Sequence, residues 1–266
     1  MGQPDFLCIG AQKAGTSWLY AMLAQNPGIF LPPVKEIHFF DFVHVPENRW
    51  WIRQMFGKTA TRLVHADSEL RGYFDRLAAL PRRSDAWYRT VFDHPRAAGR
   101  VAGEITPAYS FLPEAGVRHV RAINPAMRIL FIIRDPVDRA LSQLRMTAEK
   151  GNWAAVGPEV IENPKAVARL ATRSSYRASI ERWEAVFPSE QLLYLPYPRI
   201  AADPEGFLSD VEGFIGAPPH RYRAADKSVH RTKPLPVAPE VQPGLERLFA
   251  AEREWLAGRF GAAFGF

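Results

Sequence analysis

The chain has 266 residues, of which 47% are hydrophobic and 23% charged, the balance of an ordinary globular protein rather than a disordered one. Cys8 is the only cysteine, which excludes a scaffold built on internal disulfides. The net charge of +6 favours anionic partners in general. Nucleic acid, an anionic membrane surface and a phosphorylated cofactor all fit that charge.

The N-terminal sequence lacks a basic stretch followed by an apolar one, and no window approaches the roughly 18 apolar residues of a membrane span. We therefore expect a cytoplasmic protein that does not associate with membranes.

The first elements expected are a strand over residues 6–9, ended by Gly10, and a helix over 16–25 that stops at Asn26. Residues 29–31 and 101–105 are the next candidate strands. Residues 129–133 form an unbroken apolar run, which is typical of a strand buried on both faces of a parallel sheet. Asp135 and Pro136 then favour the start of a helix that continues through Leu144.

The later elements continue this alternation. Apolar residues at helical spacing predict a helix with one buried stripe, formed by Tyr176, Ile180, Trp183 and Phe187. Residues 191–195 predict a further strand, and a single closing helix would carry Leu245, Leu248, Phe249, Leu256 and Phe260. Strands alternating with helices predict an α/β fold with a mainly parallel sheet.

Two stretches interrupt the alternation. Residues 43–98 have a helical pattern, and residues 147–175 contain two glycines and two prolines and are expected to be rich in loops. Long insertions at the carboxyl edge of such a sheet usually shape a substrate site. A helical cap that only completes the core is an equally good interpretation of residues 43–98.

The residues between the first strand and the first helix read Gly-Ala-Gln-Lys-Ala-Gly-Thr-Ser, from Gly10 to Ser17. A loop at a helix N-terminus, with small residues, Lys13 and two hydroxyl groups, has the chemistry of a phosphate-binding site. The order differs from the nucleoside triphosphatase loop, because Lys13 precedes the second glycine by two positions.

This loop resembles the 5′-phosphosulfate loop of sulfotransferases that use 3′-phosphoadenosine 5′-phosphosulfate, especially the branch related to heparan sulfate O-sulfotransferases. Three further blocks, at residues 35–41, 103–109 and 133–136 with Ser142, resemble the same family in the same order. The resemblance runs from about residue 5 to 215. It implies a P-loop-like fold with a central parallel β-sheet flanked by helices, in one sulfotransferase domain over residues 1–266.

The resemblance assigns donor-binding roles to a set of residues in three of these blocks and in the late helix. It places Lys13 on the oxygen that bridges phosphate and sulfate, and Arg134 and Ser142 on the 3′-phosphate. The full set expected at the donor is Gln12, Lys13, Ala14, Gly15, Thr16, Ser17, Arg134, Ser142 and Tyr176.

The resemblance also assigns the acceptor site. Glu36 matches the general base of the glycosaminoglycan enzymes, with His38 as a second candidate base and Lys35 and Asp41 beside them. If residues 35–41 are extended, Glu36 and His38 share one side, and Lys35 and Asp41 lie on the other.

The chain departs from the family pattern in two places. Ile105 stands where several relatives carry a lysine. Near the C-terminus, a basic stretch without glycine replaces a glycine-containing basic loop; its members are Arg221, Arg223, Lys227, Arg231 and Lys233.

The sequence therefore predicts a sulfotransferase that transfers the sulfuryl group to a hydroxyl or amine of a small-molecule or carbohydrate acceptor, leaving adenosine 3′,5′-bisphosphate. No metal is expected, since the seven histidines lack metal-ligand spacing. Two alternatives are a P-loop kinase of a small metabolite, which would need magnesium, and a non-enzymatic nucleic-acid-binding protein. The acceptor and the oligomeric state are not predicted.

Overall fold

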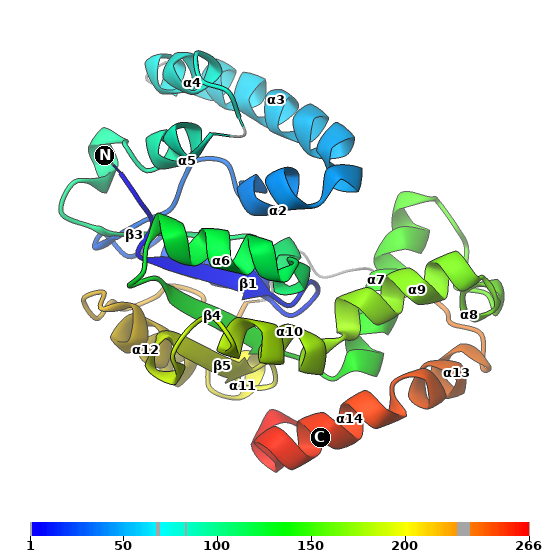
Figure 1. Ribbon diagram of the computed structural model, residues 1–266. Coiled ribbons are helices and arrows are strands. Elements are labelled where there is room, and N and C mark those ends of the chain that lie inside the picture. Colours follow the sequence, from blue (N-terminus) through cyan, green and yellow to red (C-terminus); the bar gives the residue numbers. More distant parts are fainter. Residues whose placement is uncertain (1, 68–69, 83, 228–234, 266) are drawn as a thin grey trace.

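The computed structural model describes residues 2–67, 70–82, 84–227 and 235–265. At its centre lies a five-stranded parallel sheet with the strand order β2-β3-β1-β4-β5 (Figure 1). The strands are β1 (Phe6–Gly10), β2 (Ile29–Phe30), β3 (Val101–Ile105), β4 (Arg128–Ile133) and β5 (Leu192–Pro196). The predicted α/β fold with a parallel sheet is confirmed, and the apolar runs of β1 and β4 form the buried centre of that sheet.

Helices cover both faces of the sheet. α1 (Thr16–Leu23) packs on α12 (Pro204–Ile215), where the rings of Trp18 and Phe207 meet edge to face at 5.6 Å. α6 (Glu114–Ile123) and α10 (Tyr176–Glu184) lie together over the opposite face (Figure 1), as right-handed crossovers require. α10 ends earlier than predicted, so Phe187 packs into the core from the turn after the helix.

Residues 43–98 are helical, as their pattern predicts. They contain α3 (Arg49–Ala66), α4 (Leu70–Ala78) and α5 (Asp85–Val91), and α2 (Phe39–His44) leads into them (Figure 1). This layer buries Leu70, Tyr73 and Trp87 in the main core, and it also supplies Trp51 to the cavity described below. The insertion therefore completes the core and also lines the cavity, so the interpretation that it only completes the core is wrong.

Residues 147–175 are not rich in loops, and that expectation is wrong. The segment contains the end of α7 (Pro136–Lys150), the short α8 (Glu159–Glu162) and α9 (Pro164–Ser174). The prolines begin helices instead of breaking them: Asn163 caps α9, accepting hydrogen bonds from the amides of Lys165 and Ala166, and Pro164 occupies the first turn.

The closing segment forms two helices where one was predicted. α13 (Val241–Leu248) and α14 (Ala250–Phe260) meet at Phe249. A separate four-residue helix, α11 (Arg199–Ala202), follows β5 earlier in the chain. The two helices pack into different hydrophobic clusters. Val241 and Leu245 of α13 lie in a small cluster with α7, whereas Leu256 of α14 lies in the main core. A straight helix would not reach both clusters.

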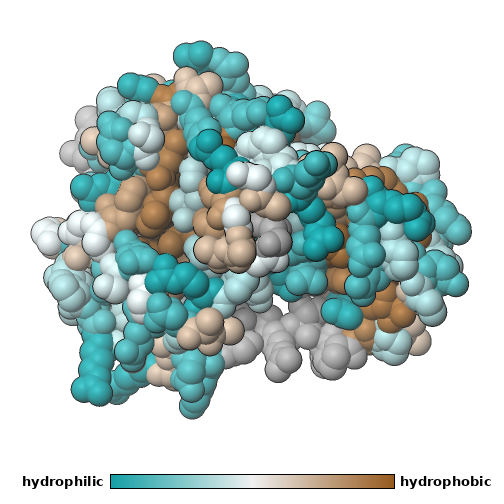
Figure 2. Space-filling model, turned by 90° about the horizontal axis from the view of Figure 1, so that it is seen from below, coloured by the Kyte–Doolittle hydropathy of each residue, from teal (hydrophilic) through white to brown (hydrophobic). Residues whose placement is uncertain are grey.

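The surface carries few large apolar groups. Among the described residues, Trp50, Trp153 and Leu248 are the large hydrophobic side chains that are well exposed. Figure 2 shows one face of the molecule, on which hydrophilic groups predominate and hydrophobic ones gather in separate areas. Within the described part of the chain, no helix has both the length and the apolar character to cross a membrane.

Candidate active site

A cavity of about 990 Å³ opens at the carboxyl ends of β1, β3 and β4, where the loops that leave these three strands meet. β1 lies at the middle of the strand order, which is where doubly wound sheets bind ligands. The side chains around the cavity come from distant parts of the chain; they include Gln12, Lys13, Thr16, Ser17, Glu36, His38, Trp51, Met55, Phe111, Arg134, Ser142, Arg145, Lys150, Arg173 and Tyr197.

The loop after β1 forms one wall of the cavity. Gly15 caps the N-terminus of α1 with a φ of 81°, a backbone conformation that favours glycine, and a Cβ there would lie 2.5 Å from the Ile200 side chain. The predicted residues Gln12, Lys13, Gly15, Thr16 and Ser17 all line the cavity. Ala14 lies outside the lining: it is buried, and its amide donates to the carbonyl of Ala11.

Arg134 follows β4 and lies against this loop. Its Nη1 donates to the carbonyl oxygen of Lys13 at 2.7 Å, and its guanidinium carbon lies 4.4 Å from the centre of the Tyr197 ring. Its buried Nε has no hydrogen-bond partner among the described residues. Tyr176 lies behind Arg134, outside the lining, where its hydroxyl accepts from the Arg134 amide at 3.4 Å.

One face of α7 continues the same wall. Ser142, Arg145, Met146 and Lys150 follow one another at helical spacing, and all four line the cavity. Asp135 begins this helix by accepting from the amides of the next turn, as predicted. Sequence reasoning missed Arg145, whose buried Nε also lacks a partner within the described residues. Its position three residues after Ser142 was a usable signal.

The basic residues of this wall affect one another. Burial lowers the pKa of Lys13, and the charges of Arg134 and Lys150 lower it further. Like charges held together at a partly buried site favour an anionic ligand, because such a ligand relieves their repulsion.

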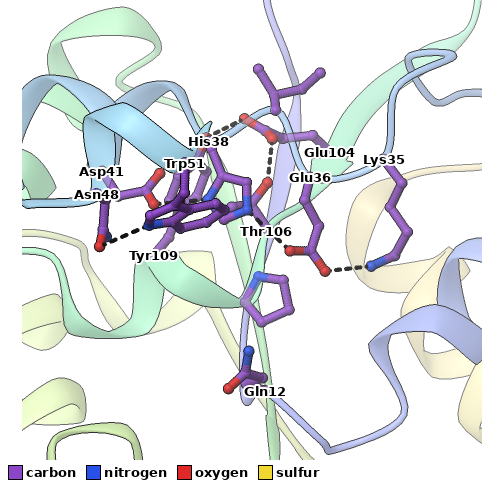
Figure 3. Close-up of polar contacts among 12 residues, drawn as sticks. Gln12, Lys35, Glu36, His38, Asp41, Asn48, Trp51, Glu104, Thr106 and Tyr109 are labelled. Atoms are coloured by element: carbon purple, nitrogen blue, oxygen red, sulfur yellow. Dashed lines mark hydrogen bonds and ion pairs between the residues drawn. The ribbon is translucent and has the colours of Figure 1, made fainter. Parts of the chain in front are cut away.

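On another side of the cavity, Glu36, His38 and Asp41 form a hydrogen-bonded chain (Figure 3). His38 Nε2 lies 3.1 Å from a carboxylate oxygen of Glu36, and His38 Nδ1 lies 2.8 Å from Asp41. The other oxygen of Glu36 accepts from Lys35 Nζ at 2.9 Å. Glu36 and His38 line the cavity, whereas Lys35 and Asp41 stand behind them.

The extended conformation predicted for residues 35–41 is wrong. Glu36 and His38 adopt left-handed φ values of 61° and 53°, and α2 begins at Phe39. Asp41 lies in the first turn of α2, three residues after His38. The helical turn therefore places the two side chains on the same side. A helix start, rather than strand alternation, brings the three polar groups together.

The environment shifts the pKa values of Glu36 and His38 in opposite directions. Burial alone raises the pKa of Glu36, but the hydrogen bond from His38 and the charge of Lys35 outweigh it and bring the pKa to about 2. Burial lowers the pKa of His38, but its bonds to Asp41 and Glu36 raise it to about 9. At neutral pH the cavity thus presents an ionised carboxylate beside a charged imidazole.

A second buried carboxylate supports this loop from β3. Glu104 accepts hydrogen bonds from the hydroxyls of Tyr88, Thr106 and Tyr109, at 2.7, 2.7 and 3.0 Å (Figure 3 shows Glu104, Thr106 and Tyr109). The Tyr109 hydroxyl in turn accepts from the amide of Phe39, at the start of α2. The network fixes the turn that carries His38, a role that sequence reasoning did not give to Glu104.

Sequence reasoning also missed residues from the two insertions. Arg173, in the last turn of α9, lines the cavity, donates to Gln12 and lies 5.2 Å from the centre of the Phe111 ring. Trp51 of α3 lies 4.8 Å from the His38 ring, edge to face. Neither residue belongs to a motif, and only the folding of the insertions brings them here.

The basic stretch near the C-terminus lies partly outside the described residues, since Arg231 and Lys233 are not described. Arg223 exchanges backbone hydrogen bonds with the Gln25 side chain, and the carbonyl of Ala225 accepts from Trp18 Nε1. The stretch thus passes beside α1, next to the phosphate loop.

Within the described residues, no group of three or more His, Cys, Asp or Glu side chains is arranged to hold a metal ion.

The parallel sheet, the loop after β1 and the basic cavity at the carboxyl edge define a P-loop-like α/β protein. The chain belongs to the sulfotransferase family, whose model matches residues 4–221. Human heparan sulfate glucosamine 3-O-sulfotransferase 6 is 29% identical over 163 residues, 58% of this chain and 46% of that protein. Human heparan sulfate glucosamine 3-O-sulfotransferase 5 is 27% identical over 228 residues, 81% of this chain and 54% of that protein. The chain spans about half the length of these relatives.

Solved structures share the fold. A sulfotransferase from Alicyclobacillus acidocaldarius superposes with a TM-score of 0.70 at 22% identity, covering 97% of this chain and 96% of that one. The sulfotransferase domain from the curacin biosynthetic pathway gives a TM-score of 0.55 at 16% identity, covering 95% and 99%. The family and the fold predicted from the sequence motifs are confirmed.

Proposed function

We propose that this protein transfers the sulfuryl group of 3′-phosphoadenosine 5′-phosphosulfate to a hydroxyl group of a small-molecule or carbohydrate acceptor. The observation that carries the proposal is that one cavity holds a phosphate-type loop, two arginines whose Nε atoms have no partner among the described residues, and an ionised carboxylate. The heparan sulfate 3-O-sulfotransferases among the relatives support a hydroxyl rather than an amine acceptor.

The residues of the cavity fit this donor. Lys13 and the hydroxyls and amides of the loop to Ser17 would hold the 5′-phosphosulfate at the N-terminus of α1. Arg134 and Ser142 would hold the 3′-phosphate, and Arg145 adds a further cation on the same helix face. The buried Nε atoms of Arg134 and Arg145 have no partner among the described residues, and an unpaired buried donor costs about 1–3 kcal/mol unless a ligand satisfies it.

When bound, the donor supplies an activated sulfuryl group and a bisphosphate that leaves. By analogy with phosphoryl transfer, the protein's task is positioning and charge neutralisation. Lys13 stabilises negative charge that grows on the leaving side. Glu36 accepts the acceptor's proton, because its side chain is 32% exposed toward the cavity whereas that of His38 is 3% exposed. His38, held by Asp41, orients the Glu36 carboxylate.

Two other functions were open from the sequence alone, a metabolite kinase and a nucleic-acid-binding protein. The family match over residues 4–221 favours sulfuryl transfer over both. A cytoplasmic location stays a prediction from the sequence.

The test is thermal unfolding of the protein with adenosine 3′,5′-bisphosphate, with adenosine 5′-phosphate and with ATP plus magnesium as comparisons. At about 100 times its dissociation constant, a ligand of the native state stabilises it by roughly 2.7 kcal/mol. We expect the bisphosphate to raise the melting temperature most. A larger shift with ATP and magnesium, or none with the bisphosphate, would overturn the proposal.

A further inference from the structure

Apolar side chains form part of the wall of the cavity that holds Glu36. Trp51 and Met55 are one helical turn apart on α3 and both line the cavity. Pro107, Ala108 and Phe111, from the turn after β3, line it as well. An acceptor molecule that reaches the Glu36 carboxylate therefore meets aromatic and aliphatic side chains.

Trp51 is held in a defined orientation. Its ring meets the His38 ring edge to face at 4.8 Å, and its Nε1 donates to the Asn48 side chain at 3.3 Å (Figure 3). A fixed indole beside a proton acceptor presents an apolar face for packing, because its single polar atom is already bonded.

Two ion pairs lie at Glu36, and Arg173 adds one positive charge that acts on Glu36 and Asp41. Lys35 pairs with Glu36, and His38 pairs with Asp41, so these four groups add no net charge. The Arg173 guanidinium donates to Gln12 and lies over the Phe111 ring. The remaining basic side chains of the lining, Lys13, Arg134, Arg145 and Lys150, belong to the loop after β1, the end of β4 and α7, where the donor would lie.

Polar partners for a sugar ring are also few on these walls. Among the described residues of the lining, Asn48 lies beside Trp51 and Gln12 beside Arg173, and each already accepts a hydrogen bond from that neighbour. Sites for carbohydrates or polyanions pair most ligand hydroxyls and charges, since unpaired buried polar groups are costly.

We propose that the acceptor is an alcohol or phenol with an apolar, planar body, and that Trp51 determines this specificity by packing against that body. The inference rests on the proposed function and specifies its acceptor class.

The first test compares acceptors in the full chain with the phosphosulfate donor. We expect kcat/KM for 2-naphthol to exceed that for an N-sulfated glucosamine–glucuronic acid hexasaccharide at least ten-fold. A higher value for the hexasaccharide would overturn the inference, and so would turnover of neither probe in a protein that binds adenosine 3′,5′-bisphosphate.

The second test uses two neighbouring tryptophans. Trp51→Ala should weaken binding of 2-naphthol to the protein saturated with adenosine 3′,5′-bisphosphate about ten-fold or more, and should leave the affinity for the bisphosphate unchanged. Trp50→Ala is the matched control, because Trp50 is 68% exposed and lies outside the cavity lining. Trp51→Phe should restore most of the binding.

Equal 2-naphthol affinity in the two alanine variants would overturn the role of Trp51. Failure of the proposed function looks different, since the wild-type protein would then not bind adenosine 3′,5′-bisphosphate at all. If Trp51→Ala loses the bisphosphate as well, Trp51→Leu decides: an intact bisphosphate site with ten-fold weaker 2-naphthol binding supports the inference, and unchanged binding of both contradicts a need for an aromatic ring at this position.

Discussion

The guanidinium of Arg134 donates a hydrogen bond to the carbonyl oxygen of Lys13 at 2.7 Å. The bond joins the loop after β1 to the end of β4, two segments 121 residues apart in the chain. It fixes the position of Lys13, which we assign to the 5′-phosphosulfate, relative to Arg134, which we assign to the 3′-phosphate. Their separate roles are distinguishable by mutation.

Lys13→Ala should lower kcat by about 10²–10³, the usual cost of removing one group that stabilises charge in the transition state. The fold should survive, because Lys13 lies on a loop that lines a cavity. Sulfuryl transfer and the melting temperature would be measured beside Lys58→Ala, which changes an exposed lysine of α3. Turnover of Lys13→Ala close to that of this control would rule out the role of Lys13.

Arg134→Ala should weaken binding of adenosine 3′,5′-bisphosphate about ten- to hundred-fold, the value of a charge-assisted hydrogen bond. Binding of adenosine 5′-phosphate should change less, because it has no 3′-phosphate. The ratio of the two dissociation constants, measured by calorimetry, is the diagnostic quantity. An unchanged ratio would mean that Arg134 only braces the Lys13 carbonyl.

Asp41→Asn should lower the pKa of His38 from about 9 toward its ordinary 6.5, because it removes the stronger of the two bonds that raise it. A raised native pKa stabilises the fold fully below pH 6.5, and that stabilisation is lost as the pH rises through 9. The wild-type free energy of unfolding should therefore fall from pH 6.5 to 9, and His38→Gln should flatten that slope. An NMR titration that gives wild-type His38 a pKa near 6.5 would refute this.

Glu36→Gln should reduce sulfuryl transfer by about 10²–10⁴, because it keeps the size of the side chain and removes proton acceptance. Affinity for adenosine 3′,5′-bisphosphate should survive. With phenols of decreasing pKa, the loss should shrink, since an acceptor that is already ionised needs no base. An equal loss for all phenols, together with weaker donor binding, would make His38 the better candidate base.

The sequence predicted those parts of the site that lie in short segments next to strands. Lys13 and Arg134 follow strands, and Ser142 lies in the helix that begins at Pro136, so their placement depends on local structure. The turn at Glu36 and His38 was not predictable, because residues other than glycine seldom adopt positive φ. Trp50 and Trp51 are adjacent, and only the packing of α3 shows which one faces the cavity.

Arg173 illustrates a second limit. It reaches the cavity because the buried guanidinium of Arg139 bonds Ser174 Oγ at 2.6 Å and the Leu170 carbonyl at 3.2 Å, and so ties α9 to α7. Such a contact joins two helices through one residue of each. Neither spacing nor composition encodes it.

The most direct test of the central claim is a crystal structure of the protein with adenosine 3′,5′-bisphosphate. We expect the 5′-phosphate in the loop from Lys13 to Ser17 and the 3′-phosphate within hydrogen-bond distance of the Arg134 guanidinium and Ser142 Oγ. A nucleotide bound outside this cavity, or bound with its 3′-phosphate directed away from Arg134, would contradict it.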